Sequence, residues 1–179
     1  TNQRETTIVW DKATGRPQVA EGARYEKAPT LIQPSQLGGH NWQPMAYDPK
    51  AGLVFIPAME STAFMVGDPA FRFQPGVWNT GVIDPAMPAD PKLIAQARQA
   101  YQGFLLAWDP VGQREAWRVA HPGPWNGGTL ATGGGLVFQG HNGGAFNAYD
   151  SANGKLLWSA PIRLHALGGP VTYASGGGQ

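Results

Sequence analysis

Four histidines and a few single acidic residues are the side chains that could hold a metal ion or move a proton. The histidines are His40, His121, His141 and His165. They stand in separate segments, with no pair at the i, i+4 spacing of a helical zinc site and no carboxylate cluster beside them. A Ca2+ site needs clustered oxygen ligands, whereas the Asp and Glu residues here occur singly in turns. The sequence therefore disfavours both zinc and calcium sites built from its own residues.

Two runs of three glycines, 133–135 and 176–178, have the composition of phosphate-binding loops. Neither run precedes a helical pattern or carries a Lys-Ser or Lys-Thr pair, so phosphate binding is disfavoured. The 133–135 run instead fits the connection of a β-hairpin.

Two further blocks pair an amide with an indole beside glycines. Asn41-Trp42 follows Gly38-Gly39-His40, and Trp125-Asn126 precedes Gly127-Gly128. From spacing alone, Asn41 is a turn-forming residue and Trp125 is a core indole before a tight strand entry. Whether these blocks also bind a ligand depends on what surrounds them.

The elements that must position these blocks are short β-strands. Helical periodicity is scarce, and short β-branched or aromatic runs recur between Gly, Pro, Asn and Asp residues. We predict strands over residues 53–57, 103–108, 115–119, 135–139, 145–149, 156–160 and 170–173. The chain is therefore predicted to be all-β.

One turn formula occurs four times: an aromatic residue, an Asp, and a Gly three or four residues later. The Asp can accept backbone N–H groups and the Gly supplies a positive φ, so each copy predicts a hairpin turn, the third being one residue shorter. The four residues Asp11, Asp48, Asp109 and Asp150 are 37, 61 and 41 residues apart. Two intervals match one four-stranded propeller blade, and the 61-residue interval requires an insertion of about 20 residues.

We place that insertion at residues 64–102, between two blades, with one short helix. Asp90 is the expected N-cap, Pro91 the first helical residue and Gly103 the stop. The apolar face of this helix would consist of Leu93, Ile94, Ala97 and Tyr101.

Composition limits the partners of the chain. Of 179 residues, 42% are hydrophobic and seven are Trp, which suffices for a core despite 25 glycines and 16 prolines. The chain has thirteen basic and twelve acidic residues, so no excess of positive charge favours binding to nucleic acid or to an anionic membrane. No apolar stretch is long enough to span a bilayer. The absence of Cys excludes disulfides and covalent c-type haem within these residues.

A longer pattern, Ala-x-Asp-x-x-x-Gly-Lys-x-x-Trp, is met in full by residues 148–158 and more weakly by residues 107–117. This pattern resembles the tryptophan-docking motif of quinoprotein dehydrogenases that use pyrroloquinoline quinone (PQQ). In that motif a Trp stacks on the turn of the neighbouring blade. We therefore assign Trp117 and Trp158 to blade packing.

The blocks at 38–47 and 124–132 resemble blocks of the quinohaemoprotein alcohol dehydrogenases, as do residues 103–111 and 169–173. The similarity extends over nearly the whole chain in consistent order. It implies that residues 1–179 form about three blades of an eight-bladed β-propeller, as an internal piece that ends before any cytochrome domain.

The resemblance also implies a chemistry. In this family, alcohols are oxidised to aldehydes by hydride transfer to PQQ, which Ca2+ chelates, with an Asp as general base. It places the Asn41 amide near the PQQ carbonyls with Trp42 beside it, and brings Trp125 and Asn126 to the cofactor rim. An uncharged amide donor can polarise a quinone oxygen without neutralising the hydride acceptor.

The family's catalytic Asp, calcium ligands, vicinal cysteine pair and cation near the quinone all precede a block like residues 1–17. We therefore expect no catalytic or metal-binding residue in this chain and no dehydrogenase activity from it alone. The resemblance implies the remaining blades of the same polypeptide, a haem c in a further domain, cytochrome c or another electron acceptor, and a periplasmic location.

Two alternatives stay open. One is a non-catalytic propeller scaffold with the same repeat, against which the Asn-Trp-Gln-Pro block of residues 41–44 argues. The other is a glucose- or methanol-type quinoprotein.

Overall fold

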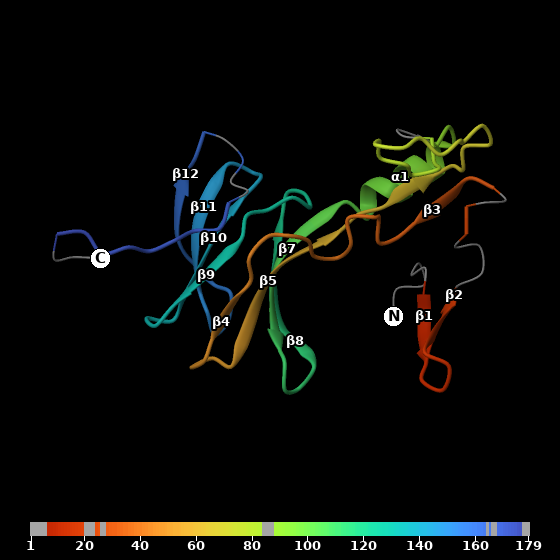
Figure 1. Cartoon of the computed structure of the whole chain (residues 1–179). Helices are drawn as coiled ribbons and strands as arrows, with labels where there is room; N and C mark the ends of the chain where they lie inside the picture. The colour runs from red at the N-terminus through yellow and green to blue at the C-terminus, as the bar shows by residue number, and fades with distance from the viewer. Residues whose placement is uncertain are drawn as a thin grey trace. The chain divides into compact units, whose positions relative to one another are not determined.

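The computed structural model describes residues 7–19, 24–25, 28–83, 88–163, 165 and 168–176. They divide into two compact units, unit 1 (residues 1–38 and 61–100) and unit 2 (residues 39–60 and 101–179). Each unit is described by itself. Both amide-indole blocks belong to unit 2, whose strands are labelled in Figure 1.

Unit 2 contains two four-stranded antiparallel sheets. The first blade has the order β4-β5-β7-β8, and the second has the order β9-β10-β11-β12. The strands of the first blade are β4 (Ala46–Asp48), β5 (Leu53–Glu60), β7 (Gln102–Asp109) and β8 (Arg114–His121). Those of the second are β9 (Thr129–Thr132), β10 (Leu136–His141), β11 (Ala145–Asp150) and β12 (Leu156–Pro161).

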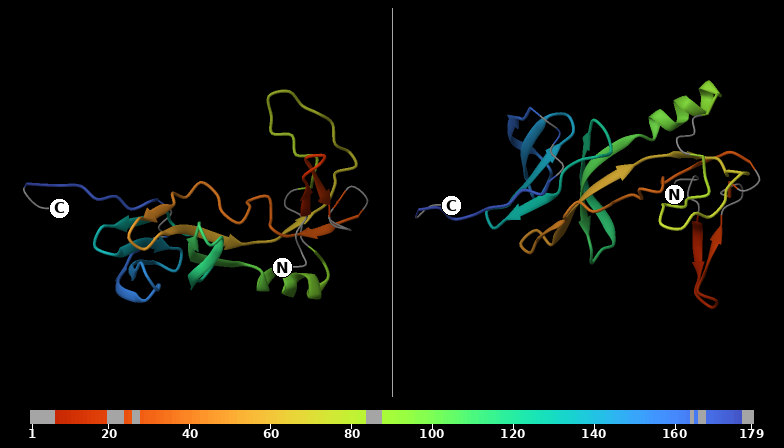
Figure 2. Two further views of the ribbon diagram at one scale, coloured as in Figure 1. Left: turned by 90° about the horizontal axis from the view of Figure 1, so that it is seen from below. Right: turned by 45° about the horizontal axis from the view of Figure 1, so that its top comes forward.

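This strand order is that of propeller blades, in which four consecutive strands form an antiparallel meander. Figure 2 shows the two sheets from two further directions. The prediction of an all-β chain forming part of a propeller is confirmed.

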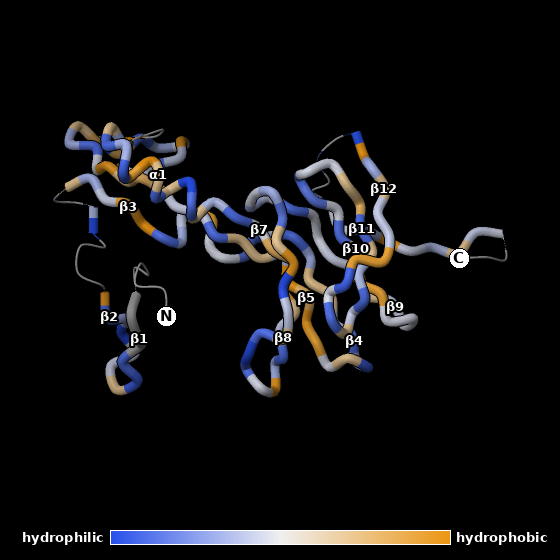
Figure 3. Tube along the Cα trace, turned by 180° about the vertical axis from the view of Figure 1, so that it is seen from behind, coloured by the Kyte–Doolittle hydropathy of each residue, from blue (hydrophilic) through white to orange (hydrophobic). Residues whose placement is uncertain are grey.

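The core of unit 2 lies between the inner faces of these sheets. Burial alternates along β5, as the two-residue period of a strand requires, and Phe55 is fully buried. Leu105 and Ala107 of β7 and Val137 of β10 are fully buried beside it. Figure 3 accordingly shows much of β5 in the colours of hydrophobic residues.

Six of the seven predicted strands are confirmed, each with slightly different ends. The prediction for residues 170–173 is wrong: this segment forms no strand, and Val171 and Tyr173 are exposed. A strand needs a neighbour to complete its hydrogen bonds, and the sequence of one segment does not reveal whether a neighbour is there.

The insertion lies within the first blade rather than between blades. It connects β5 to β7, which are direct neighbours paired from Val54–Trp108 to Glu60–Gln102. The distance between turns could not show which connection was lengthened. The insertion includes β6 (Ala63–Met65), which pairs in unit 1 with β3 (Thr30–Ile32).

The predicted helix is α1 (Pro91–Gln99) of unit 1. Asp90 caps it by accepting the Lys92 backbone N–H at 2.8 Å, as predicted. The helix ends before Tyr101, so Gly103 does not stop it. Gly103 instead lies in β7, where a Cβ would be 2.0 Å from the carbonyl oxygen of Gly123, so close packing requires a glycine there.

All four predicted hairpin turns form. The first connects β1 (Thr7–Asp11) to β2 (Arg16–Val19) in unit 1. Asp11, Asp48, Asp109 and Asp150 each accept the backbone N–H two residues on, at 2.8–3.0 Å. The fourth residue after each Asp has a positive φ.

The third turn is not shorter than the others, contrary to expectation. Gln113, with φ 50°, takes the place that Gly15, Gly52 and Gly154 occupy in the other turns. The Asp48 turn also joins the first and second strands of its blade, whereas the Asp109 turn joins the third and fourth. The 61-residue interval therefore lies within one blade and is not one blade repeat plus an insertion, because the two kinds of turn share one sequence signature.

Among the described residues, no helix is long and apolar enough to cross a membrane.

Candidate functional site

The loop that leads into β4, residues 39–45, carries the first amide-indole pair; we call it the Asn41 loop. Its start is fixed to β5, because the Met59 N–H donates to the Gly39 carbonyl at 2.8 Å and His40 Nδ1 donates to the Pro57 carbonyl at 3.0 Å. Asn41 is half-buried, and its Oδ1 accepts the Trp42 backbone N–H at 2.9 Å. The Trp42 side chain is 58% exposed, so the loop presents an indole face.

The loop between β8 and β9, residues 122–128, carries the second pair; we call it the Asn126 loop. Asn126 is 1% exposed, and both ends of its amide bond within the chain. Its Nδ2 donates to the Gly123 carbonyl at 2.8 Å, and its Oδ1 accepts the Asn142 N–H at 3.2 Å. Asn126 therefore shapes its own loop, while Trp125 beside it is half-buried.

The structure brings the two loops together. The Thr129 N–H, directly after the Asn126 loop, donates to the Pro44 carbonyl of the Asn41 loop at 2.8 Å. Gln139 of β10 holds the other side, since its Nε2 donates to the Gly127 carbonyl at 2.8 Å. Blocks more than 80 residues apart in sequence thus meet where the two blades join. Contact of Asn41, Trp42, Trp125 or Asn126 with a cofactor stays a prediction.

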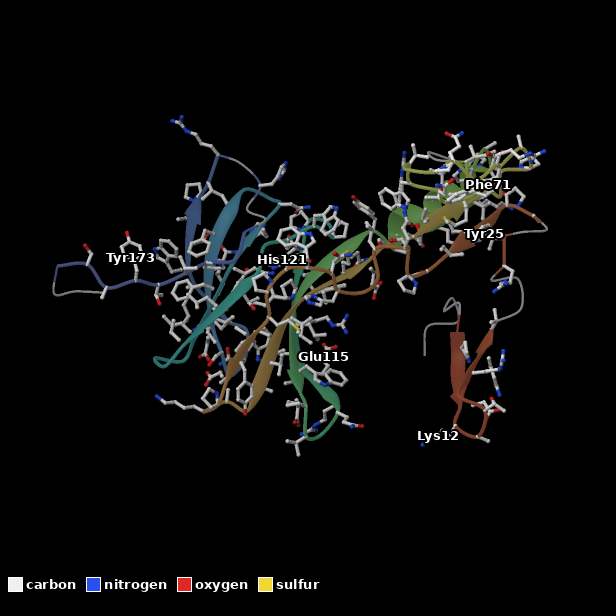
Figure 4. The ribbon with its side chains drawn as sticks, in the orientation of Figure 1. Lys12, Tyr25, Phe71, Glu115, His121 and Tyr173 are labelled. Atoms are coloured by element: carbon white, nitrogen blue, oxygen red, sulfur yellow. The ribbon has the colours of Figure 1, made fainter. Side chains whose placement is uncertain are left out.

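A histidine pair was missed by sequence reasoning. The rings of His121 and His141 stack with their centroids 4.8 Å apart and their planes at 13°. His121 Nε2 lies 2.9 Å from Gln139 Oε1, and because Gln139 donates through its Nε2 to Gly127, the histidine is the donor. Figure 4 labels His121 and Glu115 towards opposite ends of β8. His121 is the last residue of β8 and His141 is the last residue of β10. This shared position at a strand end was the one signal of the pair that the sequence offered.

Burial controls the protonation of this pair. Loss of hydration lowers the pKa of His121 to about 4, and burial also lowers the pKa of His141. Both rings are therefore neutral near pH 7. In the part of the chain that the structure describes, no three His, Cys, Asp or Glu side chains gather to hold a metal ion.

The docking assignment is confirmed for Trp117. Its Nε1 donates to the Ser151 carbonyl of the β11–β12 turn at 3.2 Å. A Cβ at Gly154 would lie 2.6 Å from the indole ring, so the ring rests on the peptide of that turn. Trp158 is 51% exposed and meets Phe146 edge-on, so its docking to another blade stays a prediction.

The blades are also joined by a buried carboxylate. Asp48, 3% exposed, accepts the Ser151 hydroxyl at 2.8 Å. This hydrogen bond is the largest cause that lowers the pKa of Asp48 below its usual value. The carboxylate is therefore charged at neutral pH, and it links the first turn of one blade to the last turn of the other.

Comparison with known proteins identifies homologues of the chain. Residues 96–179 match the family model "PQQ: Glucose/ethanol/alcohol dehydrogenase, beta-propeller domain". Quinohemoprotein alcohol dehydrogenase ADH IIB of Pseudomonas putida is 41% identical over 176 residues, covering 96% of this chain and 25% of that protein. The chain is a homologue of the quinohaemoprotein alcohol dehydrogenases.

Solved structures agree with this assignment. Quinohemoprotein alcohol dehydrogenase ADHIIG from Pseudomonas putida HK5 matches 97% of the chain and 26% of its own length, with a TM-score of 0.85 and 37% identity. A europium-containing methanol dehydrogenase matches 96% of the chain and 29% of its own, with a TM-score of 0.77 and 25% identity. This quinohaemoprotein homologue spans about a quarter of the length of the curated relatives it matches.

Proposed function

We propose that this chain is a cofactor-contacting part of a PQQ-dependent alcohol dehydrogenase that oxidises alcohols to aldehydes. The observation that carries the proposal is the meeting of the Asn41 and Asn126 loops at the joint between two docked blades. The greater similarity to quinohaemoprotein alcohol dehydrogenases than to the methanol dehydrogenase favours that class over the methanol type.

The residues of the Asn41 loop fit a planar quinone. The exposed indole of Trp42 offers a flat apolar face for stacking, and the Asn41 amide is an uncharged hydrogen-bonding group next to it. PQQ, when bound, supplies the hydride acceptor. Asn41 would polarise a quinone oxygen, Trp42 would hold the ring plane, and Asn126 would keep Trp125 in place.

Other parts of the proposal concern the whole protein. The general base, the Ca2+ ligands and any haem c would come from residues outside this chain. We further propose a periplasmic location and a cytochrome c or similar electron acceptor. These assignments rest on the family resemblance.

Replacing Asn41 tests the site. In the full-length protein, Asn41→Ala should lower kcat by about 10²-fold, the usual loss for one preorganised donor. The measurements are alcohol-dependent dye reduction and PQQ titration followed by absorbance. Asn153→Ala is the matched control, because Asn153 lies in an exposed turn and bonds Asp150. Equal losses in both variants would contradict the role of Asn41, and wild-type protein that binds no PQQ would favour the scaffold alternative.

A further inference from the structure

Pro44 is held between two glycines: Gly128, the last residue of the Asn126 loop, and Gly169, which follows the second blade. A Cβ at Gly128 would lie 2.4 Å from Pro44 Cγ, and a Cβ at Gly169 would lie 2.6 Å from the same atom. Real side chains do not approach a proline ring this closely, so both positions need glycine for the ring to fit. We call the group of Pro44, Gly128, Thr129 and Gly169 the Pro44 clasp.

Hydrogen bonds fix the same contact from the backbone side. The Pro44 carbonyl accepts the Thr129 N–H at 2.8 Å, and Thr129 Oγ1 lies 3.2 Å from that carbonyl and 3.2 Å from the Phe55 carbonyl. Thr129 is 4% exposed, so these bonds are shielded from water. Its single hydroxyl proton can serve one of the two carbonyls at a time.

The position of the clasp links the two candidate loops. Pro44 lies two residues after Trp42, and Gly128 lies two residues after Asn126. A shift of the proline ring must therefore move the Asn41 loop relative to the Asn126 loop. Displacements of about 1 Å in a positioning element can cost 10²-fold in rate.

We propose that Gly128 and Thr129 are positioning residues for PQQ: through Pro44 they set where Asn41 and Trp42 stand relative to Trp125. The proposal rests on the proposed function, since it names residues that act on the same site without touching the cofactor.

Gly128→Ala in the full-length protein is the direct test. Gly128 has no positive φ, so alanine suits the backbone. Its Cβ would lie 2.4 Å from Pro44 Cγ and, less closely, 3.0 Å from the Gly169 Cα, so the contacts that it violates are those of the clasp. We expect PQQ binding about 10-fold weaker or more, an altered PQQ absorbance band, and faster amide exchange in residues 41–45. Gly133→Ala is the matched control, because a Cβ there meets no atom within 4 Å.

A second substitution should reverse the first. Pro44→Ala removes the ring atoms that clash, so Pro44→Ala/Gly128→Ala should bind PQQ more tightly than Gly128→Ala alone, a coupling that general destabilisation does not produce. Thr129→Val should loosen the Asn41 loop in exchange experiments, and Thr129→Ser should restore it.

The outcomes are separable. Unchanged PQQ affinity, absorbance and exchange in Gly128→Ala would overturn the clasp, as would a double variant that is worse than either single one. Wild-type protein that binds no PQQ would instead overturn the proposed function, and amide exchange of the cofactor-free protein would then decide by itself whether the clasp holds the loop.

Discussion

Gln113 has a left-handed backbone conformation that is unfavourable for a residue with a side chain and that glycine adopts readily. Among the described residues it alone combines a side chain with a positive φ, 50°. We predict that Gln113→Gly raises the free energy of unfolding by about 0.5–1 kcal/mol, because the αL strain it relieves exceeds the entropy that glycine loses on folding. Urea denaturation of the full-length protein measures this change. Gln113→Ala keeps the strain and should leave the midpoint nearly unchanged, so an equal gain in both variants would contradict the explanation.

The buried His121 should make stability depend on pH. Its folded pKa of about 4 lies below the ordinary 6.5, so between these values the unfolded chain binds a proton that the folded chain does not. The contribution of His121 is thus fully favourable above pH 6.5 and is lost as pH falls towards 4. At pH 5 we expect a loss of about 2 kcal/mol relative to pH 7.

His121→Gln removes this titration while keeping a donor towards Gln139. Denaturation at pH 7 and pH 5 should therefore show a smaller pH effect in the variant than in the wild type. The same pH dependence in both proteins would rule His121 out as its source.

At the scale of single residues, the sequence predicted some features and concealed others. The four Asp caps were predictable, because an Asx turn depends on residues two apart in the chain. The His121–His141 stack was not, because it arises only when β8 and β10 approach in space. The engagement of Asn126 by Gly123 and Asn142 likewise needs the folded loops.

At the scale of elements, the Trp117 indole of the first blade joins the two blades, because it rests on the β11–β12 turn of the second blade. Gly154 has φ 73° and lies against Trp117, whereas Gly52 has φ 68° and a Cβ there would meet nothing within 4 Å. Both alanine variants carry backbone strain, and Gly154→Ala must also displace the indole. We predict that Gly154→Ala is more destabilising than Gly52→Ala by about 1–3 kcal/mol.

Thermal or urea unfolding of the two variants gives this difference directly. In the Gly154→Ala protein, the Trp117 fluorescence should also shift as the ring leaves its turn. Equal destabilisation would mean that the indole moves aside without cost.

The strands and the capped helix were predictable as elements, since alternation, turn residues and the Asp90-Pro91 start are local signals. The placement of the insertion was not, because β5 and β7 become neighbours only through the sheet. Residues 170–173 show the same limit. They have the residue pattern of a strand, but no described strand pairs with them.

At the scale of the whole molecule, the outer strands of the two blades have no paired neighbour among the strands that the structure describes. β12 ends the second blade's sheet, and its residues Leu156, Leu157 and Trp158 are each about half exposed. We predict that the 179-residue chain made by itself associates or aggregates, because exposed strand edges and apolar faces seek partners. Light scattering and sedimentation test this, and a sharp, reversible, monomeric melting transition would contradict it.

The same isolated chain should not reduce a dye with alcohol and added PQQ. We expect this because the family resemblance implies that the general base and the calcium ligands come from residues outside this chain. The full-length protein assayed alongside is the positive control. Turnover by the isolated chain would show that a base and a metal site lie within it. The number of blades in the complete ring stays a prediction, since that number depends on residues beyond these two sheets.

The pairing of Glu60 with Gln102 has a practical consequence. A long excursion that leaves and re-enters a sheet at adjacent rungs adds no strain to the ladder whatever its length. A substitute connection for residues 61–101, such as a short hairpin loop, should therefore keep the register of β5 and β7, although it removes the β6 partner of β3 from unit 1.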